Sequence, residues 1–228
     1  AEVVRADTSG GGGTLVAPPT GGVPLAMEFP VEQVDGTPNP PKIPNLLPRP
    51  KKAPTVVVAE GTELLSRGKP VTSSDEFPII GTYDLVTDGD KDTGEGYVLE
   101  LSYGLQWVQV DLEESAVISI VWVWRKHSEI RAYHDVVIQV SDDPEFKVGV
   151  TTIYNNDYDA SSPFGKGKDR PFMDSHFGQP VDGMGARGRY VRLYSSGNTF
   201  SDANHYAEVE VYGVPAANEL GLGPTVGQ

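Results

Sequence analysis

The sequence contains no cysteine, which excludes disulfides, thiolate metal sites and a thiol nucleophile. Its apolar runs are far shorter than the roughly 20 residues of a membrane-spanning helix, so we expect no membrane span of its own. It also lacks a zinc-binding HExxH motif, a serine nucleophile elbow and a Gly-rich phosphate loop followed by lysine. We therefore expect that the chain is not an enzyme and uses no organic cofactor.

Positive charge is scarce, and the deficit is confined to one part of the chain. The formal net charge is −14 over 228 residues. Residues 1–58 carry five basic and five acidic residues, whereas residues 59–228 carry 13 basic and 27 acidic ones. An acidic domain repels phosphate backbones, so we expect no nucleic-acid binding. Solubility, Ca²⁺ binding and docking on a basic partner remain as explanations of the charge.

Residues 1–58 do not have the composition of a folded domain. They hold 11 of the 19 prolines and the run Gly10 to Gly13, which predicts an extended, polyproline-like arm. Small apolar groups nevertheless recur along it, and we interpret them as anchors that enter grooves of another surface. A passive spacer is the alternative. The anchors are Leu15, Val16, Leu25, Phe29, Ile43, Leu46 and Leu47.

Residues 59–214 show short runs of alternating polarity separated by turn signals, which favours an all-β sandwich. The runs 106–112, 189–194 and 206–212 alternate, and 116–124 is almost continuously apolar, as in a central strand covered on both faces. The runs 189–194 and 206–212 frame a polar loop and predict a closing hairpin. The residues expected to face one core are Val108, Val110, Leu112, Val191, Leu193, Val209 and Val211.

Two segments lie outside this pattern. Residues 155–187 form a long stretch rich in glycine, proline and acidic residues, and we interpret it as a flap folded back on the sandwich. Residues 215–228 form a C-terminal tail.

Five motifs occur in register within residues 59–214: LVTDGDKDT, GLQWVQVDL, VVIQVSDD, GRYVRLY and AEVEVYG. Together they resemble discoidin-like domains, also called coagulation-factor C-type or galactose-binding-like domains. The resemblance implies an eight-stranded antiparallel jelly-roll sandwich with binding loops at one end. The chain is most similar to a bacterial exported subgroup, which together with its start at Ala1 leads us to expect a periplasmic or extracellular protein.

The acidic loop of residues 88–95 supplies hard oxygen ligands on glycine-permitted turns, which suit Ca²⁺. The resemblance to discoidin-like domains implies a structural Ca²⁺ held by this loop and by the first glutamate of the closing strand. Those positions are Asp88, Asp90, Thr93 and Glu208. A plain acidic surface turn is the alternative.

A compact basic and aromatic cluster follows the apolar strand. Trp122 and Trp124 share a face, and flat aromatic rings suit sugar rings and protein partners alike. The candidate ligand-binding residues are Trp122, Trp124, Arg125, Arg131 and Tyr133. Burial of the two tryptophans in the sandwich core is the alternative.

These observations favour a non-catalytic accessory or scaffold subunit of an extracytoplasmic, membrane-associated complex, such as a photosynthetic or electron-transfer assembly. The sandwich and the arm would bind its protein partners. The alternative is a carbohydrate-binding module that recognises cell-surface or polysaccharide glycans. A lipid-headgroup function is weaker, because the net charge of −14 opposes anionic membranes.

Overall fold

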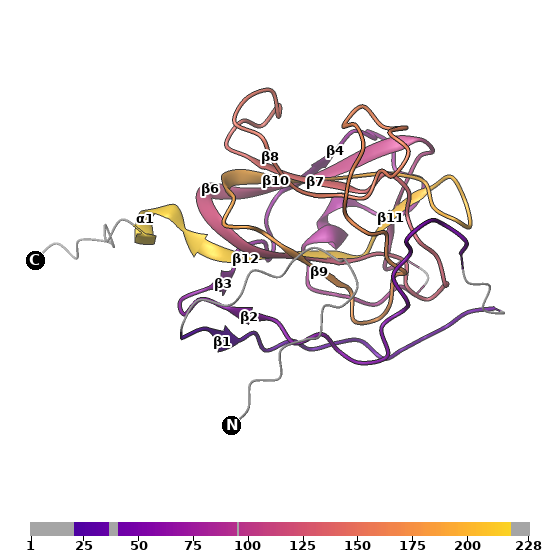
Figure 1. The fold of residues 1–228 in the computed structure, drawn as a ribbon, viewed down its shortest axis with the longest axis horizontal. Helices are drawn as coiled ribbons and strands as arrows, with labels where there is room; N and C mark the ends of the chain where they lie inside the picture. Colours follow the sequence, from indigo (N-terminus) through magenta and orange to yellow (C-terminus); the bar gives the residue numbers. More distant parts are fainter. Residues whose placement is uncertain (1–20, 37–40, 95, 220–228) are drawn as a thin grey trace, which may run out of the picture.

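A computed structural model describes residues 21–36, 41–94 and 96–219 (Figure 1). Within these residues the chain is almost entirely strand and loop. The strands are β1 (Val23–Pro24), β2 (Val57–Val58), β3 (Glu63–Leu64), β4 (Val71–Ser73), β5 (Leu99–Leu101), β6 (Leu105–Trp124), β7 (Val137–Ser141), β8 (Thr151–Asn155), β9 (Gln179–Asp182), β10 (Arg187–Ser196), β11 (Asn204–Tyr206) and β12 (Glu208–Pro215), and the helices are the 3-10 turn η1 (Tyr83–Val86) and α1 (Ala216–Glu219).

Strand β6 is the centre of the fold. Its first half lies between β4 and β10, and its second half lies between β9 and β12. Glu113, between the halves, has a left-handed φ of 68°. One long strand thus belongs to both layers of an antiparallel sandwich, as Figure 1 shows where β6 curves from the upper layer into the lower one. The predicted all-β antiparallel sandwich is confirmed.

The space between the two layers is filled by aliphatic side chains. All seven residues predicted to face one core lie in this inner core and are buried. Tyr133, Tyr154, Phe172 and Tyr206 complete it at one end. The period-two alternation of three strands was therefore assigned to the correct faces.

Two predictions about the strands were wrong. The runs 106–112 and 116–124 are one continuous strand, because the chain bends at Glu113 without leaving the ladder. The runs 189–194 and 206–212 do not form a hairpin: β10 pairs with β6 and β7, while β12 pairs with β6 and β3. They flank the same central strand from the two layers, and the short β11 pairs with β5 instead.

The arm covers the outer face of the lower layer. In Figure 1, β1 and β2 lie beneath β12 and β9 as a further layer, and β1 pairs antiparallel with β2. A second, smaller core forms there from Ile120, Trp122, Trp124 and Tyr212 with Val56 and Val58. Leu25, Met27 and Phe29 pack against it from the arm. The continuously apolar run 116–124 is thus covered on both faces, as predicted.

Three of the predicted anchors of the arm contact this chain's own sandwich. Leu25 and Phe29 join the outer core, and Leu47 joins the inner core while its backbone N–H donates to the Pro171 carbonyl at 2.8 Å. Ile43 and Leu46 are half-buried. Leu15 and Val16 lie outside the described residues. The binding of other proteins by these side chains remains a prediction.

Across the described ranges, no helix is both long and apolar enough to cross a membrane.

We expect Leu193→Ala to lower the free energy of unfolding by about 2–5 kcal/mol, because Leu193 is fully buried in the inner core. Chemical denaturation measures the change. Val148→Ala is the control, because Val148 is exposed and its truncation should change stability by no more than about 0.5 kcal/mol. Equal stability of the two variants would contradict the strand register.

We expect Phe29→Ala to loosen the arm, lower stability by about 1–3 kcal/mol and shift tryptophan emission to longer wavelength. The reason is that the Phe29 ring lies 5.9 Å from the Trp122 ring and 5.3 Å from that of Phe177. Val31→Ala is the matched control in the same arm, where Val31 is 83% exposed. Unchanged emission in Phe29→Ala would mean that the arm does not cover Trp122 in solution.

Candidate functional site

The predicted aromatic and basic cluster is buried. Trp122 and Trp124 stack with their ring centroids 5.7 Å apart and 8° between planes, and their indole N–H groups donate to the carbonyls of Phe177 and His176. The arm covers this pair from outside. In this structure the two tryptophans therefore offer a ligand no exposed face, and they act as outer-core residues.

The other three members of that cluster are buried as well. The Arg125 guanidinium lies over the rings of Tyr133 and Phe172, at 4.6 and 5.2 Å from their centroids. Arg131 pairs with Glu129 and lies 5.1 Å from the Phe200 ring. Tyr133 contacts His205 Nδ1 through its hydroxyl at 2.9 Å. All three side chains are at most 2% exposed, so they support the loops around them and present no surface of their own.

Asp174 is the acidic partner of this buried network. Its burial raises the pKa of the carboxyl to about 6, against the opposing field of Arg125 and Arg131. Arg49 reaches the network from the arm and donates through Nε to the Asp174 carbonyl at 3.3 Å. The network ties arm, flap and inner core together.

The predicted calcium residues lie around one loop but differ in exposure. Asp88 and Asp90 are exposed, while Thr93 and Glu208 are buried. Glu208 Oε2 accepts from the Gly89 backbone N–H at 3.0 Å, which joins the acidic loop to β12. Thr93 Oγ1 accepts from the Ser128 backbone N–H at 3.2 Å.

Glu208 has a buried carboxylate oxygen that a bound cation could satisfy. Its Oε1 is buried without a hydrogen-bond partner among the described residues. Burial raises the pKa of this carboxyl to about 8, and the neighbouring Glu210 carboxylate acts in the same direction. A hard cation at this oxygen would satisfy it and favour its charged form.

Two cationic side chains of the chain itself border this loop. Arg67 donates to the Asp88 carbonyl at 3.0 Å and to Glu210 at 3.3 Å, and Lys91 pairs with Glu210 at 2.8 Å. They neutralise Glu210 and leave Glu208 Oε1 unpaired. The donor set of Asp88, Asp90, Thr93 and Glu208 therefore fits Ca²⁺, which would tie the loop to β12, and calcium binding remains a proposal.

A different group of acids converges more tightly. Among the described residues, Asp135, Asp157 and Asp159 bring carboxylate oxygens within 4.8 Å of one another. Asp157 is engaged by its own loop, since it accepts hydrogen bonds from the amides of Ser161 and Ser162 and from the Ser162 hydroxyl. Asp135 accepts from the Ser161 hydroxyl.

Several loops meet at one end of the sandwich, which we call the loop end. Strand β4 ends there at Ser73, and Leu105 at the start of β6 lies opposite Ser196 at the end of β10. Six exposed apolar side chains lie in the loops of this end or at the start of β6. They are Phe77, Ile79, Ile80, Tyr103, Leu105 and Phe200.

Hydrogen bonds hold these loops to one another. The Ser102 amide donates to Asp75 Oδ2 at 2.7 Å, and Asn204 Nδ2 donates to the carbonyls of Ser102 and Gly104 at 3.0 and 2.9 Å. Ile80 and Glu100 exchange backbone hydrogen bonds. Although partial burial acts to raise it, the amides of Ser102 and Phe77 hold the pKa of Asp75 below its ordinary value.

A polar pair lies under the same loops. His205 Nε2 is 3.3 Å from Glu100 Oε2, and its Nδ1 faces the Tyr133 hydroxyl. Burial, helped by the charge of Arg131, lowers the pKa of His205 to about 3, so the imidazole is neutral at physiological pH. The loop end therefore combines exposed rings with a rigid polar base.

Sequence reasoning missed this surface. The signal was the run Phe77 to Ile80, four residues with no polar side chain between Glu76 and Gly81, in a segment with turn residues and no strand alternation. Tyr103 before Gly104 is a second such signal. Only the topology brings the two together.

Comparison with known proteins adds solved structures of similar shape. No protein-family model matches the chain, and no curated protein does. A family 89 glycoside hydrolase from Clostridium perfringens matches 68% of this chain at 23% identity and a TM-score of 0.48, but this chain covers only 15% of that enzyme. The CBM32 of AlyQ matches 62% of this chain and 92% of its own at 17% identity and a TM-score of 0.46.

A chitosan-binding module from a chitosanase/glucanase of Paenibacillus sp. IK-5 matches 66% of this chain and 99% of its own. Its identity is 21% and its TM-score 0.43. Identities and scores this low do not decide what the present chain binds.

We expect Ca²⁺ to raise the melting temperature, and chelator to cancel the rise. A ligand of the native state stabilises by roughly 2.7 kcal/mol at a hundredfold excess over its Kd. Calorimetry of metal-free protein with and without Ca²⁺ tests this, and Asp90→Ala should remove most of the gain. Asp142→Ala is the control, since Asp142 is exposed in another loop. An unchanged melting curve would leave the loop as an acidic turn.

The pH dependence of the stability of metal-free protein should show that the Glu208 carboxyl is buried and unpaired. A raised native-state pKa means that its neutral form favours the fold; this stability is complete below about pH 4.5 and is lost as the pH rises through about 8. Glu208→Gln keeps the group neutral, so the variant should lose less stability between about pH 5 and pH 9. It should also lose the response to Ca²⁺. The same pH profile in both proteins would contradict a buried, unpaired Glu208.

Proposed function

We propose that the chain is a non-catalytic carbohydrate-binding module whose ligand surface is the loop end. The observation that carries the proposal is the group of exposed rings on loops that are tied together by hydrogen bonds. Tyr103, Phe77 and Phe200 are 69%, 83% and 73% exposed, although large apolar side chains are usually buried. Flat rings of this kind stack on the apolar faces of pyranose sugars.

The polar groups of the loop end support the same proposal. Asp75 and Glu100 supply carboxylates at the loop end, and sugar hydroxyls donate to such acceptors. The loops are fixed before a ligand arrives, which lowers the entropic cost of binding. The resemblance of the sequence to discoidin-like domains implies binding loops at one end, and the exposed rings lie at an end of that kind.

A protein partner is the second candidate, favoured by the aliphatic part of the same surface. Ile79, Ile80 and Leu105 add apolar area that a sugar does not need and that a protein interface uses. An accessory subunit of a larger extracytoplasmic complex would bind through this surface. The described part of the arm packs on its own sandwich, which leaves the loop end as the surface for such a partner.

A glycan array with Ca²⁺ present should give binding that Tyr103→Ala weakens more than about tenfold, because a stacking ring is a typical hot spot. Tyr97→Ala is the matched control, since Tyr97 is also exposed but precedes β5, whereas Tyr103 follows it. A silent array, together with a protein that co-purifies with the native chain and is lost on Ile79→Asp, would favour the accessory subunit.

A further inference from the structure

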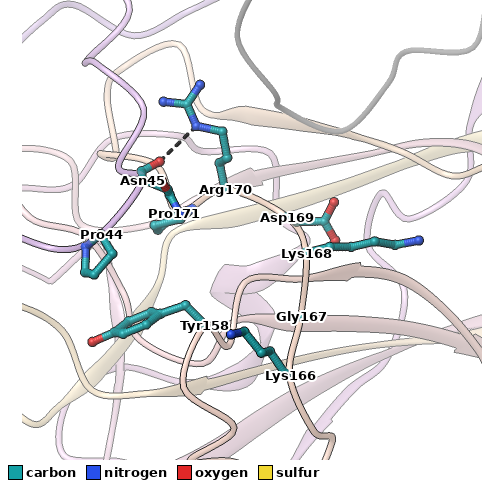
Figure 2. A pocket seen from close by; sticks show the side chains of 9 residues that line it. All are labelled: Pro44, Asn45, Tyr158, Lys166, Gly167, Lys168, Asp169, Arg170 and Pro171. Atoms are coloured by element: carbon teal, nitrogen blue, oxygen red, sulfur yellow. Dashed lines mark hydrogen bonds between the residues drawn. The ribbon is translucent and has the colours of Figure 1, made fainter.

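A pocket lies between the arm and the flap, and none of its lining residues belongs to the exposed apolar group of the loop end. Its volume is about 280 Å³, enough for one small ring rather than a drug-sized ligand. The arm contributes Pro44 and Asn45, and the flap contributes Tyr158 and residues 166–171 (Figure 2). Because every residue that lines it belongs to the arm or the flap, the strands of the sandwich alone do not form it.

The pocket is built from fixed backbone. Arg170 donates through Nε to the Asn45 carbonyl at 2.9 Å, and the Leu47 amide donates to the Pro171 carbonyl. On the other side, Asn155 and Asp169 exchange hydrogen bonds through the Asp169 amide and carboxylate. A side chain at Gly167 would collide with the Asn155 carbonyl, so this glycine permits the close approach.

Its charge is opposite to that of the molecule. Lys166, Lys168 and Arg170 lie within five residues, in a chain whose net charge is −14. Asp169 also lines the pocket and accepts from the Asn155 amide at 2.7 Å, so the lining residues named here carry three cations against one carboxylate. Among the described residues, no carboxylate forms a salt bridge with Lys166.

The pocket also has apolar walls. Figure 2 shows the Tyr158 ring between Pro44 and the side chain of Lys166, while Lys168 extends in the opposite direction. Tyr158 is half-buried, which leaves part of its ring free for contact. A lysine and an aromatic ring that line the same pocket suit a ligand with a negative group on a small, partly apolar ring.

We propose that the pocket binds a single acidic sugar unit, a pyranose that carries a carboxylate or a sulfate. Lys166 pairs with the anionic group, the Tyr158 ring packs on the sugar face, and Asn45 is placed by Arg170 to bond a hydroxyl. The inference deepens the proposed function, on which the choice of a sugar rests, but it concerns a different site. The arm is then part of the binding site as well as a cover for the outer core.

The test uses the full chain and follows backbone amide resonances during titration with glucuronate, glucose 6-sulfate, glucose and inorganic sulfate. Shifts at residues 158 and 166–170 with either acidic sugar, and not with glucose, are expected at millimolar concentrations. Lys166→Met and Tyr158→Leu should each weaken this binding about tenfold. Lys147→Met removes the same charge from an exposed lysine in another loop and should change affinity less than twofold. Melting temperatures check that each variant is folded.

The outcomes separate the two proposals. Acidic-sugar binding that depends on Tyr103 and not on Lys166 would overturn the pocket and retain the loop end. Binding that depends on Lys166 and survives Tyr103→Ala, with a silent glycan array, would support the pocket and contradict the loop end. Inorganic sulfate binding as tightly as the sugars, with no effect of Tyr158→Leu, would overturn the acidic-sugar assignment. No shift at the pocket with any anion would also overturn it.

Discussion

The structure depends on burial of both faces of strand β6. The strand takes part in both layers of the sandwich, and its second half carries apolar side chains on both sides. One side faces the inner core, where Val121 and Val123 meet the opposite layer. The other side presents Trp122 and Trp124, which a two-layer sandwich would leave in water. Stacked indoles expose a large apolar area, so a third layer is needed.

The arm supplies that layer. Its described residues, 21–36 and 41–58, form strands of only two residues each, so the order of this part comes from the surface it covers. Proline suits this role, because an extended chain with fixed φ loses less entropy on docking than a flexible one. The arm continues past the tryptophans to the flap, where Arg49 and Arg170 bond across the boundary. Arm and flap thus hold each other in place on the sandwich.

The sequence predicted what depends on local pattern. Alternation placed Val108, Leu193 and Val209 on the inner core, and the apolar run 116–124 indicated a strand covered twice. The pairing of the strands was not predictable in the same way, since β10 and β12 are close in sequence but join different layers. The local sequence pattern of a strand does not specify its pairing partner. Strand β6, which lies between β10 and β12 in the fold, is some 80 residues earlier in the chain.

The candidate site shows the same limit. The sequence correctly placed Trp122 and Trp124 on one face, but the segment that covers them lies about 95 residues away, at Phe29. An exposed platform and a covered core have the same local pattern. Conversely, Phe77 and Tyr103 are ordinary loop residues in sequence, and only the bonds through Asp75, Ser102 and Asn204 bring their loops together.

Burial of charge explains why the basic cluster does not form a surface of its own. Arg125 and Arg131 lie among aromatic rings and beside Asp174, where an unpaired cation would be costly to bury. Their role is to fix the loops between β6 and β7 and to support Phe200 at the loop end. Lys166, by contrast, lies outside this buried cluster and lines a pocket together with Pro44 and Asn45 of the arm. In this chain the arm that completes the hydrophobic packing also lines the pocket that contains Lys166.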